Sequence, residues 1–168
     1  MKYTLVLFAC AAAFAAENQL STDAKNLYTS AKNNLIRAAE KMPEENYSFK
    51  PTPEVRSFGQ LVGHVADAQY LFCSAVLGDK NPAPGVEKGK TAKADLVQGL
   101  KDGFAYCDKA YNGMTDAQAA EVVKFFGREQ AKLSVLAFNT AHSNEHYGNI
   151  VTYMRMKNLV PPSSEGRR

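Results

Sequence analysis

Four long segments of this chain repeat their apolar residues at intervals of three and four, the spacing that places side chains on one face of an α-helix. None of them shows the strict alternation that is typical of a half-buried strand. With 45% apolar residues in a chain of 168, there is enough material for one core in one domain. We therefore predict an all-α fold, a four-helix bundle whose helices span residues 21–42, 58–77, 91–111 and 129–157.

Local signals set the ends of these helices. Pro43 ends the first helix, and the loop of residues 43–55 that follows has three prolines and two aromatic residues to hold it in place. Ser57 and Gln60 have the spacing of a capping box, which predicts the start of the second helix. Asn112 and the glycine after it predict the end of the third.

The long connections allow the chain to cross the bundle. Residues 78–90 are polar and rich in glycine and proline, and an extended segment of this length can run along a 20-residue helix of about 30 Å. Residues 114–128 are expected to form a second structured crossover, with a short helix at 116–120. These connections permit an up-down-down-up topology. In that topology Cys73 and Cys107 lie at similar depths in parallel helices.

Two interpretations of these cysteines remain open. A disulfide is geometrically allowed, although the side-chain approach that it requires is narrow. The alternative is a pair of small buried apolar residues, a role that cysteine often takes.

The chain has only three histidines. His142 and His146 are four residues apart, so on a helix their imidazoles point toward a common site. His64, the third histidine, lies on the edge of the apolar stripe of the second helix. If these helices face each other, three nitrogen ligands with one open position could bind a divalent metal, with zinc as the default and nickel or iron as alternatives. The other interpretation is that they are core histidines with satisfied hydrogen bonds.

The sequence gives weaker evidence that three other side chains belong to the histidine site. Glu145 precedes the second histidine and so is not in the position of a zincin glutamate, which favours a carboxylate on the flank of the site. Asp67, one turn after His64, either orients that ring or is a surface charge. Tyr153 either lines the site or packs in the core.

Residues 57–68 and 141–155, with the Pro-Pro-Ser that ends at Ser163, resemble the DinB/YfiT-like family. The resemblance implies an up-down-down-up four-helix bundle, often a homodimer, with a divalent metal held by one histidine of the second helix and two of the fourth. Those ligands correspond to His64, His142 and His146. Relatives include thiol-dependent S-transferases and isomerases, and proteins assigned only as metal-dependent hydrolases.

The function we predict is therefore a divalent-metal-dependent enzyme acting on a small molecule. It would use either metal-activated water, as a hydrolase, or a metal-bound thiolate, as an S-transferase. The alternative is a non-catalytic metal- or ligand-binding bundle in which the ion is structural. The charged residues are 22% of the chain and mixed in sign, with a net charge of +3 and no basic block, which argues against a nucleic-acid partner.

The first sixteen residues have the features of a secretory signal. A lysine precedes an apolar run, and residues 13–15 match the small-x-small pattern of a signal peptidase site. The run is too short to span a bilayer, so no stable membrane insertion is expected after cleavage. We predict a signal peptide at 1–16, a DinB-like domain at 17–164 and a polar tail at 165–168, with export to the periplasm or outside the cell. A lipoprotein signal ending at Cys10 is a weaker alternative.

Overall fold

The computed structural model describes residues 18–166, so the predicted signal peptide lies outside the described part of the chain. The fold is mostly helical, and the four predicted long helices are present. In chain order the elements are α1 (Gln19–Lys41), η1 (Glu44–Asn46), α2 (Phe58–Leu77), α3 (Val86–Gly89), α4 (Lys93–Tyr111), α5 (Asp116–Ala119), β1 (Val122–Phe125), β2 (Arg128–Ala131), α6 (Lys132–Met156) and η2 (Pro162–Ser164).

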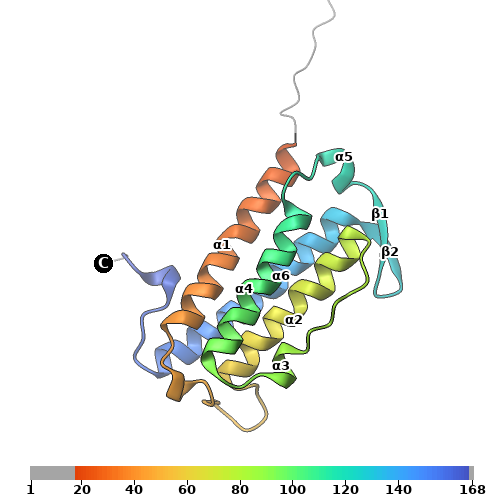
Figure 1. The fold of residues 1–168 in the computed structure, drawn as a ribbon. Helices are drawn as coiled ribbons and strands as arrows, with labels where there is room; N and C mark the ends of the chain where they lie inside the picture. The colour runs from red at the N-terminus through yellow and green to blue at the C-terminus, as the bar shows by residue number, and fades with distance from the viewer. Residues whose placement is uncertain (1–17, 167–168) are drawn as a thin grey trace, which may run out of the picture.

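The four long helices α1, α2, α4 and α6 lie side by side, with α2 in contact with both α4 and α6, and α1 packed against α6 and α4 (Figure 1). In Figure 1, α1 and α6 run from the upper end to the lower end, whereas α2 and α4 run the opposite way. One continuous core fills the space between them. Within the described residues, no helix is both long enough and apolar enough to cross a membrane.

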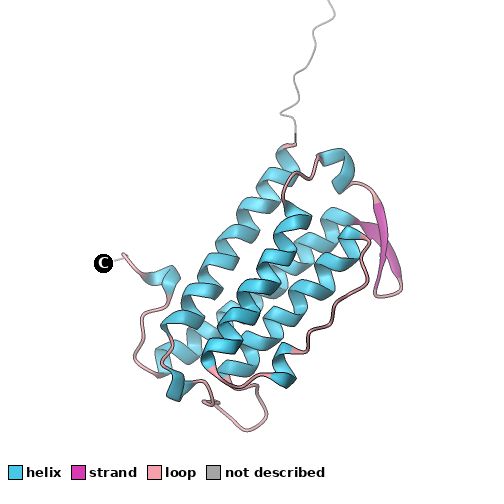
Figure 2. Cartoon of the chain, viewed as in Figure 1, coloured by secondary structure: helices cyan, strands magenta, loops and turns pink. Residues whose placement is uncertain are grey.

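A small antiparallel sheet corrects the all-α prediction. Strands β1 and β2 pair from Val122 with Ala131 to Phe125 with Arg128, and they stand at the edge of the helices (Figure 2). Residues 122–126 are Val-Val-Lys-Phe-Phe, a short apolar run without the strict alternation that would indicate a half-buried strand. The predicted start of the last helix at residue 129 was therefore wrong, since α6 begins only after β2 ends.

The second half of α1 buries its apolar residues as the helical spacing predicts, but the first half does not. Leu20 and Leu27 fit the same spacing of three and four, yet they are 61% and 64% exposed. Tyr28 is buried in this half of the helix, stacked on Tyr111 at 3.8 Å between ring centroids, and its hydroxyl donates to the carbonyl oxygen of Phe104. A buried tyrosine usually finds a hydrogen-bond partner for its hydroxyl, as Tyr28 does here.

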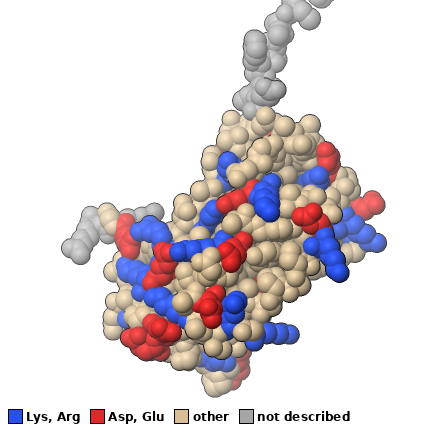
Figure 3. Space-filling model, viewed as in Figure 1, with Lys and Arg blue, Asp and Glu red and all other residues tan. Residues whose placement is uncertain are grey.

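Other boundary signals are confirmed. Ser57 and Gln60 form the predicted capping box at the start of α2. The loop after α1 is held by Tyr47, which is buried and donates a hydrogen bond of 2.6 Å to the carbonyl oxygen of Ala39. On the face that Figure 3 shows, acidic and basic side chains are interspersed. Lys32 and Asp108 form one of the ion pairs of the described residues.

A disulfide joins the parallel helices α2 and α4. Cys73 and Cys107 are both fully buried, and their Cα atoms are 5.2 Å apart. The helices approach closely because Gly103 has no side chain: a Cβ there would lie 2.8 Å from the carbonyl oxygen of Ala66. Of the two interpretations left open above, the structure has the bonded pair.

Reduction of this bond should lower the free energy of unfolding. The bonded residues are 34 positions apart, and closing a loop of that length in the unfolded chain stabilises the fold by about 3 to 4 kcal/mol. Guanidinium unfolding with and without a reductant measures the difference. A Cys73→Ala/Cys107→Ala variant is the control and should not respond to reductant; an unchanged midpoint for the reduced native chain would contradict the prediction.

Candidate metal centre

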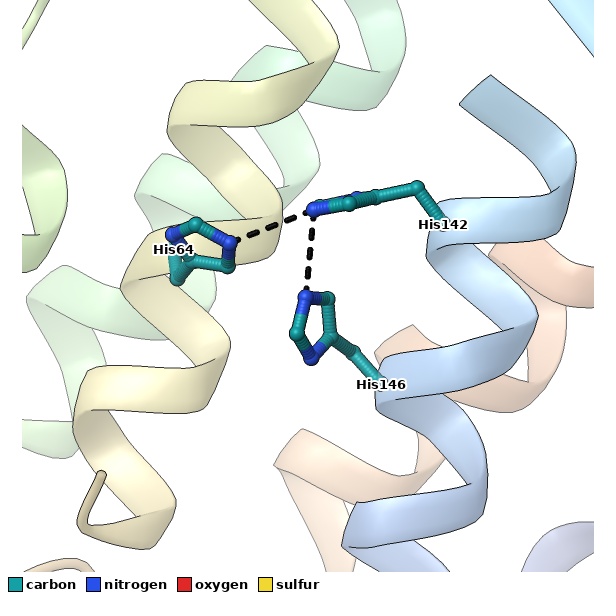
Figure 4. Close-up of side chains that lie close together, drawn as sticks. All are labelled: His64, His142 and His146. Carbon is teal, nitrogen blue, oxygen red and sulfur yellow. Dashed lines mark hydrogen bonds between the residues drawn. The ribbon is translucent and has the colours of Figure 1, made fainter. Parts of the chain in front are cut away.

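The three histidines meet between α2 and α6, with their Nε2 atoms turned toward one another (Figure 4). The Nε2 atom of His142 lies 3.2 Å from that of His64 and 3.1 Å from that of His146. The candidate ligand atoms of the three residues all lie within 4.8 Å of one another. The predicted convergence of two distant segments is therefore present in the structure.

Hydrogen bonding alone accounts poorly for this arrangement. An imidazole Nε2 atom has either one proton or one lone pair, so His142 can make only one good hydrogen bond with it, while two other nitrogens compete for it. A cation would accept the lone pairs of all three. Tetrahedral zinc with Zn–N bonds of about 2.0–2.1 Å places its ligand nitrogens about 3.3 Å apart. The two separations from His142 are close to this value, and all three candidate ligand atoms lie within 4.8 Å of one another, so the three side chains can surround one metal ion.

Glu87 fixes the orientation of the His64 ring. Its Oε2 atom lies 3.0 Å from Nδ1 of His64, and its Oε1 atom accepts a 2.8 Å hydrogen bond from Nε of Arg56. Burial raises the pKa of Glu87, but Arg56 and His64 together, through their hydrogen bonds and charge, outweigh it and hold that pKa below its ordinary value. The resulting carboxylate accepts the Nδ1 proton of His64 and leaves its Nε2 lone pair free for a metal.

The short helix α3 brings Glu87 to this position. Both carboxylate oxygens of Asp67 accept backbone hydrogen bonds at the start of α3, from the N–H groups of Val86 at 2.8 Å and Glu87 at 3.0 Å. Gly63 allows the approach, since a Cβ there would lie 2.6 Å from Cα of Glu87. Neither role considered for Asp67 is correct: it positions the residue that orients His64.

The other two rings are held less tightly. The side-chain amide of Asn149 lies 3.5 Å from Nδ1 of His146. The Nδ1 atom of His142 is buried and has no hydrogen-bond partner among the described residues. Packing against Phe72, at 5.6 Å between ring centroids, positions the His142 ring instead.

The environment keeps both histidines of α6 uncharged at neutral pH. Burial, together with the nearby His146, His64 and Arg56, lowers the pKa of His142 to about 4. Burial and His64 also lower the pKa of His146. A neutral imidazole has a free lone pair, so these two rings could bind a cation at pH 7 without first losing a proton.

Two cavities border the three histidines. A cavity of about 540 Å³ is lined by His64 and His142 and by Phe126 of the β-hairpin. A second cavity, of about 590 Å³, is lined by His146, Arg56 and Glu145 among others. The site is therefore accessible to small molecules, with Glu145 on its flank.

Two residues near the site could not be identified from sequence. Glu87 and Arg56 lie outside the long helices, where no periodicity indicates which way a side chain points. Tyr153, considered above as lining or packing, does both: it is buried, borders the second cavity and donates a 2.7 Å hydrogen bond to the carbonyl oxygen of Arg56.

The metal-free protein should lose stability as the pH falls from about 6.5 to about 4. In the unfolded chain His142 takes up a proton near its ordinary pKa of 6.5, whereas in the folded chain it does so only near 4. Between these values the unfolded state binds more protons, so the free energy of unfolding decreases as the pH is lowered. Thermal midpoints in chelator test this. A His142→Gln variant should show a shallower decline, and identical slopes would contradict the assignment.

Comparisons with known proteins show which family has this sequence pattern and fold. The DinB superfamily profile matches residues 27–150. The uncharacterized protein YjoA of Bacillus subtilis is 27% identical over 134 residues, covering 76% of this chain and 84% of that protein. Its crystal structure gives a TM-score of 0.66 at 24% identity, covering 85% of this chain and 94% of that one.

Other solved structures share the fold. A DinB-like protein from Bacillus cereus gives a TM-score of 0.73 at 18% identity, covering 84% of this chain and 95% of that one. A mutant of mycothiol-dependent maleylpyruvate isomerase gives 0.65 at 13% identity, covering 77% of this chain and 60% of that one. Because the superfamily profile extends over most of its length, this chain belongs to the DinB superfamily.

Proposed function

We propose that this protein is a divalent-metal-dependent enzyme in which His64, His142 and His146 hold the ion. Zinc is the first candidate, with nickel or iron as alternatives, because three imidazoles discriminate poorly between these metals. The observation that carries the proposal is the meeting of three Nε2 atoms, two of them 3.1 and 3.2 Å from the central one, at a place that two cavities border.

Three protein ligands leave a coordination position for a substrate or water, which is the arrangement of catalytic zinc sites. When bound, such an ion lowers the pKa of water or of a thiol and so supplies a nucleophile at neutral pH. The protein's own contribution is to keep the two histidines of α6 neutral and to orient the ring of His64. Glu87 holds the proton on Nδ1 of His64, and Arg56 keeps Glu87 ionised.

Two reactions fit this proposal. A hydrolase would use activated water on an ester or amide. An S-transferase would use a small thiol, and the thiol dependence named for the isomerase with a similar fold supports this second reaction. At 13% identity that likeness concerns the fold alone, so both reactions are tested below.

A second candidate function is a structural ion that ties α2 to α6. One observation favours it: the three histidines come from these two helices, which a bound ion would link. A structural site needs a fourth protein ligand, and the candidate metal groups found among the described residues contain only the three histidines. The accessible catalytic site is therefore the stronger proposal.

Three further points belong to the same proposal. The four long helices form an up-down-down-up bundle, which the opposite directions of the α1–α6 and α2–α4 pairs in Figure 1 support. Export through residues 1–16 is proposed from their sequence alone. A homodimer is proposed from the family resemblance.

Metal analysis tests the site directly. Protein loaded with zinc and desalted should retain about one equivalent, and a chelator should lower its thermal midpoint. His142→Ala removes the central ligand, so zinc affinity should fall by at least tenfold while the helical circular dichroism is kept. Asn144→Ala, on the exposed side of α6, is the matched control. Full zinc retention by His142→Ala would contradict the proposal.

The same proteins test catalysis. Zinc-loaded protein is assayed for hydrolysis of 4-nitrophenyl esters, and for conjugation of small thiols to 1-chloro-2,4-dinitrobenzene. Activity in either assay that needs zinc and is lost in His142→Ala supports an enzyme and identifies which nucleophile it uses. Zinc binding without activity in either assay supports the structural alternative.

A further inference from the structure

We propose that the 540 Å³ cavity beside His64 and His142 binds an aromatic part of the substrate, and that Phe126 at the tip of the β-hairpin determines this specificity. The inference rests on the proposed function, because it assigns a substrate class to the same site. Two independent observations support it. The first is the exposure and mutual contacts of the apolar side chains that line the cavity, and the second is the backbone conformation of the hairpin turn.

Apolar side chains from four separate parts of the chain form the wall of the cavity. Phe72 is central to them: its ring lies 5.1 Å from that of Phe138 and 5.6 Å from that of His142, centroid to centroid. An aromatic group placed here would therefore lie beside the metal ligands. The apolar lining consists of Ala68, Leu71, Phe72, Ala83, Phe126 and Phe138.

The acidic groups of the cavity already have partners. Both oxygens of Asp67 accept backbone hydrogen bonds from α3, and Glu87 is held by Arg56 and His64. They are therefore less able to bind a polar substrate. What the cavity offers a ligand is mainly apolar surface, as is usual for sites that bind small organic molecules.

Two of the phenylalanines are exposed to an extent that folding does not explain. Phe126 is 65% exposed and Phe138 is 47% exposed, whereas Phe125, the neighbour of Phe126 on the same hairpin, is only 5% exposed. Large apolar groups left in water around a concave surface are typical of a binding site. An aromatic ligand would cover both rings.

The backbone conformation of the hairpin turn also supports a ligand contact at Phe126. Phe126 has φ = 47° and Gly127 has φ = 76°, so both residues of the two-residue turn are left-handed. Such a turn favours Asn-Gly or Asp-Gly, and phenylalanine is strained there. Four described non-glycine residues have positive φ, and the two that are not asparagine, Phe126 and Ala83, both line this cavity. A contact between Phe126 and a ligand would explain why phenylalanine occupies a turn position that favours asparagine or aspartate.

Two hydroxamate probes test the inference on the zinc-loaded protein. Benzohydroxamate and acetohydroxamate share one metal-chelating group and differ in a phenyl or methyl substituent. Because the phenyl group would be buried against the cavity wall, benzohydroxamate should bind at least about tenfold more tightly in calorimetry.

Phe126→Asn separates ligand binding from folding. It supplies the residue that the turn prefers, so the thermal midpoint should stay the same or rise. The preference for benzohydroxamate should fall by about threefold or more, with acetohydroxamate affinity unchanged. The matched control is Val122→Ala, which changes a residue of the same hairpin that is 64% exposed but does not line the cavity. It should leave both affinities unchanged.

The failures are distinguishable. Equal affinities of the two probes for zinc-loaded protein would overturn this inference and leave the metal site standing. Failure to retain zinc would overturn the proposed function itself. If Phe126→Asn converts a dimer to a monomer in gel filtration while the probe preference is unchanged, a second copy of the chain covers these rings and the inference is overturned.

Discussion

The convergence of three imidazoles from two helices is the constraint on which the rest of this structure depends. The Nε2 atom of His142 lies 3.2 Å from that of His64 and 3.1 Å from that of His146. One Nε2 atom can make a good hydrogen bond to only one of these neighbours. A single cation can accept the lone pairs of all three nitrogens. The surrounding fold holds it in place. Helix α2 carries His64, packs against α6 and is joined through Cys73 to α4 by the disulfide.

A second layer of residues turns this convergence into an oriented site. Asp67 fixes the start of α3, Gly63 leaves room for it, and Glu87 on α3 then meets Nδ1 of His64. Arg56, held by Tyr153 through its carbonyl oxygen, completes the chain of contacts. Such partners of metal-binding histidines fix the ring and its tautomer, and their loss commonly costs tenfold or more in metal affinity.

The sequence predicted what periodicity can indicate. The spacing of His142 and His146 and the edge position of His64 predicted their meeting, and the caps and prolines predicted most helix ends. Exposed and irregular segments were harder. Leu20 and Leu27 fit the helical spacing yet face solvent, while Tyr28 is the large side chain that is buried in this half of α1. The β-hairpin has one buried residue, and Glu87 lies in a polar connection, so neither has a periodic signal.

The central claim is that one metal ion binds all three histidines. X-ray absorption spectroscopy of the zinc-loaded protein tests it most directly, because the fine structure reports both the ligand atoms and the number of imidazole rings. The account predicts three imidazole nitrogens at about 2.0–2.1 Å, one further light ligand and no sulfur. A spectrum with fewer than three imidazoles, or with a sulfur ligand, would contradict it.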